Sequence, residues 1–225
     1  TGGLNTALGL NALYNNTTSS QNTAVGHTAL FANTTGGFNT AMGYKAGEAV
    51  TTGSGNAFFG LRAGAGTTTG TANTFIGGSS NSYVGFANTT GANNTAVGTD
   101  ALAANTTASN NTAVGMDALD ANTTGPANTA VGAGALTTNI TGADNTALGQ
   151  NSLGLSTGGS NTGVGQSSLA ANTTGGSNTA IGRKSGDTLT TGGNNTLLGH
   201  DAQPSAVGVS NEITLGNGSI GAIRC

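Results

Sequence analysis

Residues 22–43, NTAVGHTALFANTTGGFNTAMG, contain nearly the same phrase twice, and the second copy begins 17 residues after the first. The phrase recurs along the chain, each time from an asparagine that we call position 0: Asn5, Asn22, Asn39, Asn56, Asn73, Asn94, Asn111, Asn128, Asn145, Asn161, Asn178, Asn195 and Asn211. Most steps are 17 residues long, two are 16, and the step from Asn73 to Asn94 is 21. A period kept this strictly predicts one structural unit per copy, stacked on its neighbours.

The motif Asn-Thr-Ala-Val-Gly predicts an extended strand, because its side chains alternate with period two. Asn and Ala point to one side of such a strand, and Thr and Val point to the other. The following Asn-Thr-Thr-Gly-Gly is turn chemistry. We therefore expect a short strand, a turn, a second short strand around Thr-Ala-Leu and another turn in each copy. The fold class is all-β, a parallel β-solenoid or β-roll of 17-residue repeats, with a left-handed coil favoured.

Two columns of large apolar residues are predicted to be buried. Position +3 holds Leu8, Val25, Met42, Phe59, Ile76, Val97, Val114, Val131, Leu148, Val164, Ile181 and Leu198, and position +8 holds Leu13, Leu30, Leu102, Leu119, Leu136, Leu153 and Leu169. Thr at position +1 shares a strand face with position +3, so it is expected to be buried too. The Asn column at position 0 is expected to form a ladder of side-chain amides along the axis.

The charged residues follow the same grid. Nine of the 13 lie at positions +6 and +9, which predicts a solvent-facing surface: Lys45, Glu48, Arg62, Asp100, Asp117, Asp120, Lys184, Asp187 and Asp201. At Gly47, Gly64 and Gly186 the +8 leucine is lost and position +6 is Lys or Arg, so the stem of the basic side chain is expected to cover the gap.

The supply of large apolar side chains bears on the oligomeric state. About two per coil is little for a solenoid that must fill its own interior at the density of a protein core. This favours a homotrimer, intertwined or side by side, over a monomeric solenoid. A trimer would place the single cysteine, Cys225, near the threefold axis.

The spacing of the repeats divides the chain into four parts. Residues 1–72 and 94–210 are regular repeats, and residues 73–93 form an irregular coil with a partial copy, NSYVG, at Asn81. Residues 211–225 form a terminal segment.

Composition excludes several classes of protein. Glycine accounts for 41 of 225 residues, and the net charge is only -3, too weak to attract nucleic acid or an anionic membrane. No apolar run has the length of a membrane span. One cysteine allows neither an internal disulfide framework nor a zinc motif.

The residues with chemical potential do not form a catalytic set. His27 and His200 both occupy position +5 but lie ten repeats apart, so they cannot serve one site, and neither an enzyme nor a cofactor is expected. Asp100, Asp117 and Asp120 are a weak candidate for a Ca²⁺ site. Asn-x-Thr triplets such as Asn33-Thr34-Thr35 are interpreted as turn chemistry, and the sequence leaves their glycosylation open.

Aromatic residues are concentrated before Ala87, and five of them cluster around the irregular coil: Phe58, Phe59, Phe75, Tyr83 and Phe86. One interpretation is local filling of the core where the coil widens. The other is a bulge that presents Tyr83 and Phe86 to a sugar or a partner.

The array resembles two families of fibrous proteins. NTAVGxxAL is similar to the head repeats of trimeric autotransporter adhesins, which form a left-handed parallel β-roll in a trimer, and more closely to the NTAVGxxALxxNTTGxx arrays of bacteriophage tail fibres and tail spikes. The segment NEITLGNGSIGAIRC, residues 211–225, is similar to the one preceding the self-cleaving chaperone of endosialidase-type fibres. The chaperone domain and its Ser-Asp cleavage site are absent from this sequence, so no catalytic residue carries over.

These resemblances imply a structural shaft of a phage tail fibre or tail spike, located in the virion and used in host attachment. Its expected partners are copies of itself, other tail fibre or baseplate proteins, and a host surface glycan or receptor, without nucleic acid or membrane insertion. A bacterial surface adhesin head is the alternative. An ice-binding solenoid is a further alternative suggested by the Thr column, although burial of that column would argue against it.

Overall fold

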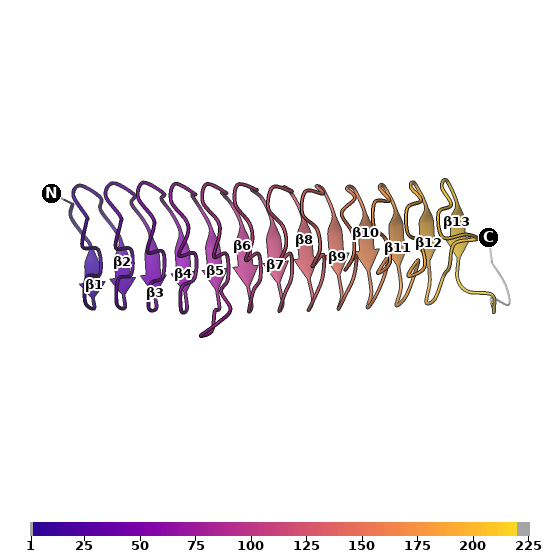
Figure 1. The fold of residues 1–225 in the computed structure, drawn as a ribbon, viewed down its shortest axis with the longest axis horizontal. Coiled ribbons are helices and arrows are strands. Elements are labelled where there is room, and N and C mark those ends of the chain that lie inside the picture. The colour runs from indigo at the N-terminus through magenta and orange to yellow at the C-terminus, as the bar shows by residue number, and fades with distance from the viewer. Residues whose placement is uncertain (1, 220–225) are drawn as a thin grey trace.

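A computed structural model describes residues 2–219 as a parallel β-solenoid, an elongated stack of coils with the first strand, β1, at one end and the last, β13, at the other (Figure 1). Each coil contributes one three-residue strand to a 13-stranded parallel sheet in which neighbours in sequence are neighbours in space. The strands are β1 (Thr6–Leu8), β2 (Thr23–Val25), β3 (Thr40–Met42), β4 (Ala57–Phe59), β5 (Thr74–Ile76), β6 (Thr95–Val97), β7 (Thr112–Val114), β8 (Thr129–Val131), β9 (Thr146–Leu148), β10 (Thr162–Val164), β11 (Thr179–Ile181), β12 (Thr196–Leu198) and β13 (Ile213–Leu215).

The register of the sheet confirms the repeat. Val97 is paired with Val114, and Val114 with Val131, so equivalent residues of successive coils are stacked along the axis. The register also survives the irregular steps, since Thr74 pairs with Thr95 across 21 residues. The extra residues are accommodated in a loop after β5, and the sheet continues without a break through residues 73–93. The register corrects the last repeat: Ile213 pairs with Thr196, so Glu212, not Asn211, occupies position 0 there, and the last step is 17 residues long.

The predicted second strand around Thr-Ala-Leu is wrong. In the coil that begins at Asn22, Thr28 and Leu30 have φ of 53° and 50°, in the left-handed region, and similar values recur at these positions in most other coils. The alternation of left-handed and ordinary residues bends the chain into a tight arc. Hydrogen bonds still join the coils there, for example from the Leu30 N–H to the Ala46 carbonyl oxygen at 3.0 Å.

Glycine at position +4 is required where two coils approach closely. Gly26 has φ of 134°, and a Cβ atom built on it would lie 2.3 Å from the carbonyl oxygen of Gly43 in the next coil. Both the backbone conformation and the available space therefore exclude a side chain.

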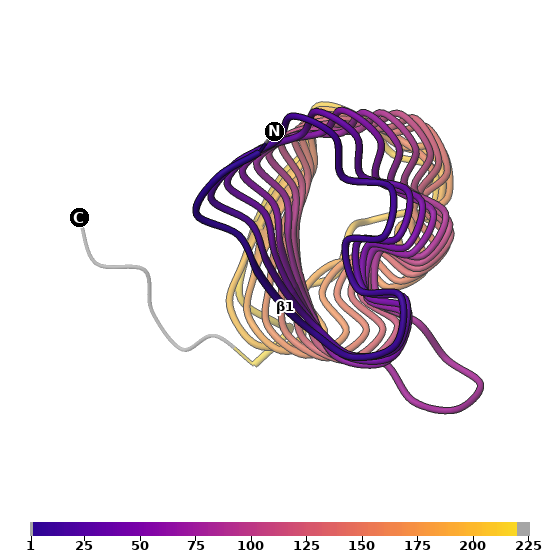
Figure 2. The ribbon, with the colours of Figure 1, turned by 90° about the vertical axis from the view of Figure 1, so that its left-hand side faces the viewer.

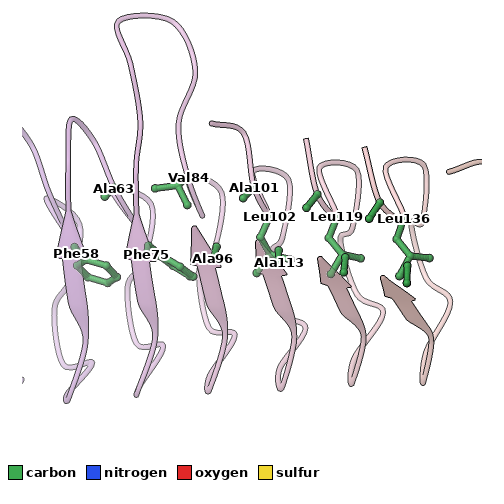
Figure 3. Close-up of a cluster of buried hydrophobic side chains, with 14 of the residues drawn as sticks. Phe58, Ala63, Phe75, Val84, Ala96, Ala101, Leu102, Ala113, Leu119 and Leu136 are labelled. Carbon is green, nitrogen blue, oxygen red and sulfur yellow. The ribbon is translucent and has the colours of Figure 1, made fainter. Parts of the chain in front are cut away.

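The core lies inside each single coil, and its composition corrects one prediction. The buried column of the strand is position +2, usually alanine, together with Asn at position 0, whereas position +3 points outward. The +8 leucines are buried as predicted, and they meet the alanines of positions +2 and +7 in a narrow interior (Figure 3). Small residues fill this interior because the coil is thin.

The gaps left by glycine at position +8 are filled from within, not by the stems of basic residues. Phe58 and Phe75 replace the usual alanine at position +2, are fully buried and stack with ring centroids 5.5 Å apart. A Cβ atom on Gly47 or Gly64 would lie 2.7 or 2.5 Å from the Phe58 ring. Core filling is thus confirmed for Phe58 and Phe75.

The asparagines of position 0 form the expected ladder, mainly through their side-chain oxygen. The Asn39 Oδ1 atom accepts hydrogen bonds from the backbone N–H of Asn56 at 3.0 Å and from its Nδ2 at 3.0 Å. The Nδ2 atom of Asn56 also donates to the carbonyl oxygen of Gly70. The amide therefore bridges two strands and a turn, which keeps buried polar groups paired.

A second ladder runs through the interior at position +11. The Nδ2 atoms of Asn105, Asn122 and Asn139 each donate to the Oδ1 atom of the asparagine one coil earlier, at 2.7, 3.1 and 3.2 Å. Where the next member of this ladder is replaced, by Ser156 in one case, the preceding Oδ1 atom is buried without a hydrogen-bond partner. The Oδ1 atoms of Asn33 and Asn172, one coil before Val50 and Leu189, are likewise buried without a partner.

Candidate functional site

The outer face of the sheet is the most extensive candidate surface. It is formed by positions +1 and +3 of all thirteen strands, and we call it the outer sheet face. The prediction that the +3 column is buried is wrong for the single coil, since its residues are half-buried or exposed. Those with the largest exposed fractions are Leu8, Met42, Ile76, Leu148, Ile181, Leu198 and Leu215, at 37–66%.

The outer sheet face carries no charged side chain on the described strands. Charges lie beside it, for example Asp144 before β9, Arg183 after β11 and Glu212 directly before β13. An uncharged strip of aliphatic and threonine side chains thus follows the sheet from β1 to β13. Soluble monomers rarely leave an apolar surface of this extent uncovered.

The threonines at position +1 also lie on the outer sheet face, so the expectation that they are buried is wrong. Thr6, Thr129 and Thr146 are exposed, and the others are half-buried. They form a ladder in register along the sheet. The spacing of that ladder equals the strand spacing of about 4.8 Å.

The charged columns at positions +6 and +9 lie on the surface as predicted, beyond the corner that follows the strands. Lys45 and Glu48 form an ion pair at 3.0 Å, the only one found in residues 2–219. Further along the same two columns, small side chains leave a hollow of about 320 Å³, lined by Gly134, Thr137, Asn151, Gly154, Leu155, Ser167 and Ala170. The hollow contains no charged group.

The three candidate calcium ligands do not form a metal site. In the described part of the chain, no three histidine, cysteine or carboxylate groups are close enough together to hold a metal ion. The carboxylates do repel one another electrostatically. Burial, and then the negative charges of Asp100 and Asp117, raise the pKa of Asp120 above its usual value. Asp100 has a structural partner, since its Oδ1 atom accepts a hydrogen bond from the Tyr83 N–H at 2.8 Å.

The aromatic residues around the loop divide into two groups. Phe58 and Phe75 belong to the core, whereas Tyr83 and Phe86 lie on the surface at positions equivalent to +6 and +9, with ring centroids 5.0 Å apart. The guanidinium carbon of Arg62 lies 5.2 Å from the centroid of the Tyr83 ring. Sequence reasoning missed Arg62 as part of this group, although its place in the same column one coil earlier was a sufficient signal.

The remaining candidates are separated or buried. His27 stacks on Tyr44 with centroids 5.3 Å apart, and His200 lies in the coil of β12, ten coils away. Asn33 and Asn122, which begin two Asn-x-Thr triplets, are fully buried in the interior, so the folded chain does not present them for glycosylation. Cys225 lies outside the described residues.

Comparison of the chain with protein-family models, with curated proteins and with solved structures finds no match. Within residues 2–219, no helix is long and apolar enough to cross a membrane. The case for function therefore depends on the surfaces described above.

Proposed function

We propose that this chain is the rigid shaft of a phage tail fibre or tail spike, with a structural role in host attachment and no catalysis. The outer sheet face would be the interface at which three parallel copies pack side by side. The observation that supports this proposal is the uncharged strip of aliphatic and threonine side chains that continues over all thirteen strands.

The size of the outer sheet face agrees with such an interface. Thirteen strands about 4.8 Å apart give a length of about 60 Å, and three residues of about 3.3 Å each give a width of about 10 Å. The resulting face of roughly 600 Å² per copy, shared between the aliphatic column and the threonine column, approaches the half-area of a standard interface. Each coil already fills its own interior, so side-by-side packing suits the chain better than intertwining.

The interior explains how such a shaft would be rigid. Each coil is tied to the next by backbone hydrogen bonds in the strand and in the arc, and by asparagine amides at positions 0 and +11. Buried polar groups that are fully paired hold a structure in one arrangement. A chain built this way transmits force along its axis.

The proposal predicts a trimeric mass for the intact chain by size-exclusion chromatography with light scattering. Val114→Asp puts a charge on the outer sheet face and should dissociate the trimer, because three carboxylates would be buried together. Thr124→Asp, at an exposed turn position, is the matched control and should leave the trimer intact. A monomeric wild-type chain that remains folded would contradict the proposed assembly.

A bacterial adhesin head would use the same assembly. The two roles differ in the rest of the gene, because an adhesin requires a membrane-anchor barrel and a coiled-coil stalk.

The exposed threonine ladder favours ice binding as a second candidate function. A regular threonine array is the surface that such a function needs, and here it lies outside the coil. The neighbouring +3 column varies from Val to Met and Phe, however, which roughens the face. Thermal hysteresis measured in a nanolitre osmometer would test this function, and a freezing point equal to the melting point would reject it.

A further inference from the structure

The loop after β5 is an addition to an otherwise regular coil. If residues 78–81 are left out, Ser82, Tyr83, Val84 and Gly85 follow Gly77 as positions +5 to +8 of a 17-residue repeat. Val84 and Gly85 are buried, as their equivalents are in regular coils. The four extra residues therefore leave the core intact, and the loop projects from the corner that follows the strands (Figure 2).

The loop is polar and locally ordered. Its stem is closed by a hydrogen bond from the Ser79 N–H to the Ser82 carbonyl oxygen at 2.7 Å. Ser79, Ser80 and Asn81 are exposed at its tip. Their hydroxyl and amide groups can both donate and accept hydrogen bonds.

The aromatic pair at the base of the loop is fixed from two sides. The Tyr83 hydroxyl donates to the Ser80 carbonyl oxygen at 2.9 Å, and the Tyr83 N–H donates to Asp100 in the next coil. Phe86 is 38% exposed and tilted by 33° against Tyr83. Fixing the rings in advance reduces the entropy that a ligand must overcome on binding.

The surrounding groups define the chemistry of a ligand. The guanidinium of Arg62 lies over the Tyr83 ring and is not in an ion pair within residues 2–219. The second carboxylate oxygen of Asp100 accepts no hydrogen bond from the described residues. An exposed aromatic ring, a cation, a free carboxylate oxygen and a polar loop suit a molecule with one apolar face and many hydroxyl groups.

We propose that Phe86, Tyr83, Arg62, Asp100 and the loop of residues 78–81 form a binding site for a neutral hexopyranose of a surface glycan. The C–H face of the sugar packs on Phe86, and its hydroxyl groups bond to Arg62, Asp100 and the loop. A neutral sugar is favoured over an acidic one, because the single cation, Arg62, is outnumbered by three acids, Asp100, Asp117 and Asp120, in the coils that follow. This inference rests on the proposed attachment role, since it names the class of receptor.

The test is saturation-transfer NMR of the full chain with maltotriose, mannotriose and a galactose trisaccharide, and with trigalacturonic acid as the acidic counterpart. We expect a neutral trisaccharide to bind. Phe86→Ala should weaken that binding by about tenfold, the effect of losing one aromatic contact. Tyr14→Ala removes an exposed aromatic ring from the same +9 column four coils earlier, beyond the reach of a trisaccharide, and should leave the affinity unchanged.

Deletion of residues 78–81 provides a second variant that should remain folded, because it restores the 17-residue step. It should weaken binding while the melting temperature stays close to that of the wild type. The proposal is overturned if no neutral trisaccharide binds, if trigalacturonic acid binds better, or if Phe86→Ala and the loop deletion both bind like the wild type.

The failure of this inference differs from the failure of the proposed function. A trimeric chain that binds none of the sugars would overturn only the saccharide site. A monomeric chain that binds them would overturn only the trimeric shaft, since the loop lies around the corner from the outer sheet face.

Discussion

Replacing Phe58 by Ala should open a cavity inside the shaft, and a second substitution should close it. Phe58 is fully buried, fills the space over Gly47 and Gly64 and stacks on Phe75. Truncation of a buried phenylalanine costs about 3–5 kcal/mol. The loss of the Phe75 stack places this variant in the upper part of that range.

Gly64→Leu is expected to lower the free energy of unfolding of the wild type and to raise that of the Phe58→Ala variant. In the wild type the new side chain would collide with the Phe58 ring, and overpacking costs about 1–3 kcal/mol. In the Phe58→Ala background the same leucine recreates the alanine–leucine pair of the regular coils. The backbone already suits it, since Gly64 has φ of 60° and Leu102, at the equivalent position of a regular coil, has 55°.

The size of the rescue follows from two opposing terms. Burying a leucine contributes up to about 3 kcal/mol, and the left-handed conformation costs about 1–2 kcal/mol relative to glycine. We therefore expect the leucine to restore about 1–2 kcal/mol in the Phe58→Ala background. Guanidinium denaturation of the four variants at one protein concentration measures the coupling. Equal destabilisation by Gly64→Leu in both backgrounds would refute the proposed complementarity.

Two further predictions concern buried polar groups. Ser156→Asn should stabilise the chain by about 1 kcal/mol, because the longer amide can donate a hydrogen bond to the unpaired Oδ1 of Asn139 and still accept the one from Asn172. Ser156→Ala removes the acceptor for Asn172 and should destabilise the chain. A lower denaturation midpoint for Ser156→Asn than for the wild type would contradict this prediction. The raised pKa of Asp120 means that its ionised form costs stability at neutral pH, so stability should rise as the pH falls through the folded-state pKa toward 3.8. Asp120→Asn should therefore melt at a higher temperature than the wild type at pH 7, and the difference in melting temperature should shrink near pH 4. A lower melting temperature of Asp120→Asn at pH 7 would show that the ionised Asp120 does not destabilise the fold.

The sequence was sufficient for the repeat, the parallel stack, the buried +8 column and the asparagine ladder. The sequence did not show which face of each strand points into the coil. Alternation with period two says which residues share a face but not which face is inside, and a shift of one residue reverses the assignment. The rule that larger side chains lie inside fails here, because the narrow coil admits alanine and asparagine and leaves valine outside.

The substitutions between columns held the missing information. Phe58 and Phe75 occupy position +2 in coils whose +8 residue is glycine, Gly64 and Gly85. Such compensation indicates that positions +2 and +8 share one space, which fixes the inward face. The left-handed backbone at residues such as Leu30 could not be inferred in the same way, because leucine rarely adopts it unless the surrounding structure requires it.

The shaft and the proposed sugar site can coexist because a solenoid coil makes contacts only with its neighbours. An insertion at the corner after the strand has to satisfy the coil before it and the coil after it, and here Arg62 and Asp100 meet Tyr83 from those two coils. Extending a surface loop by four residues costs little conformational entropy. The outer sheet face lies on another side of the coil and keeps its register through the insertion. The same chain can therefore vary its loop, and with it the ligand, without altering the surface through which it would assemble.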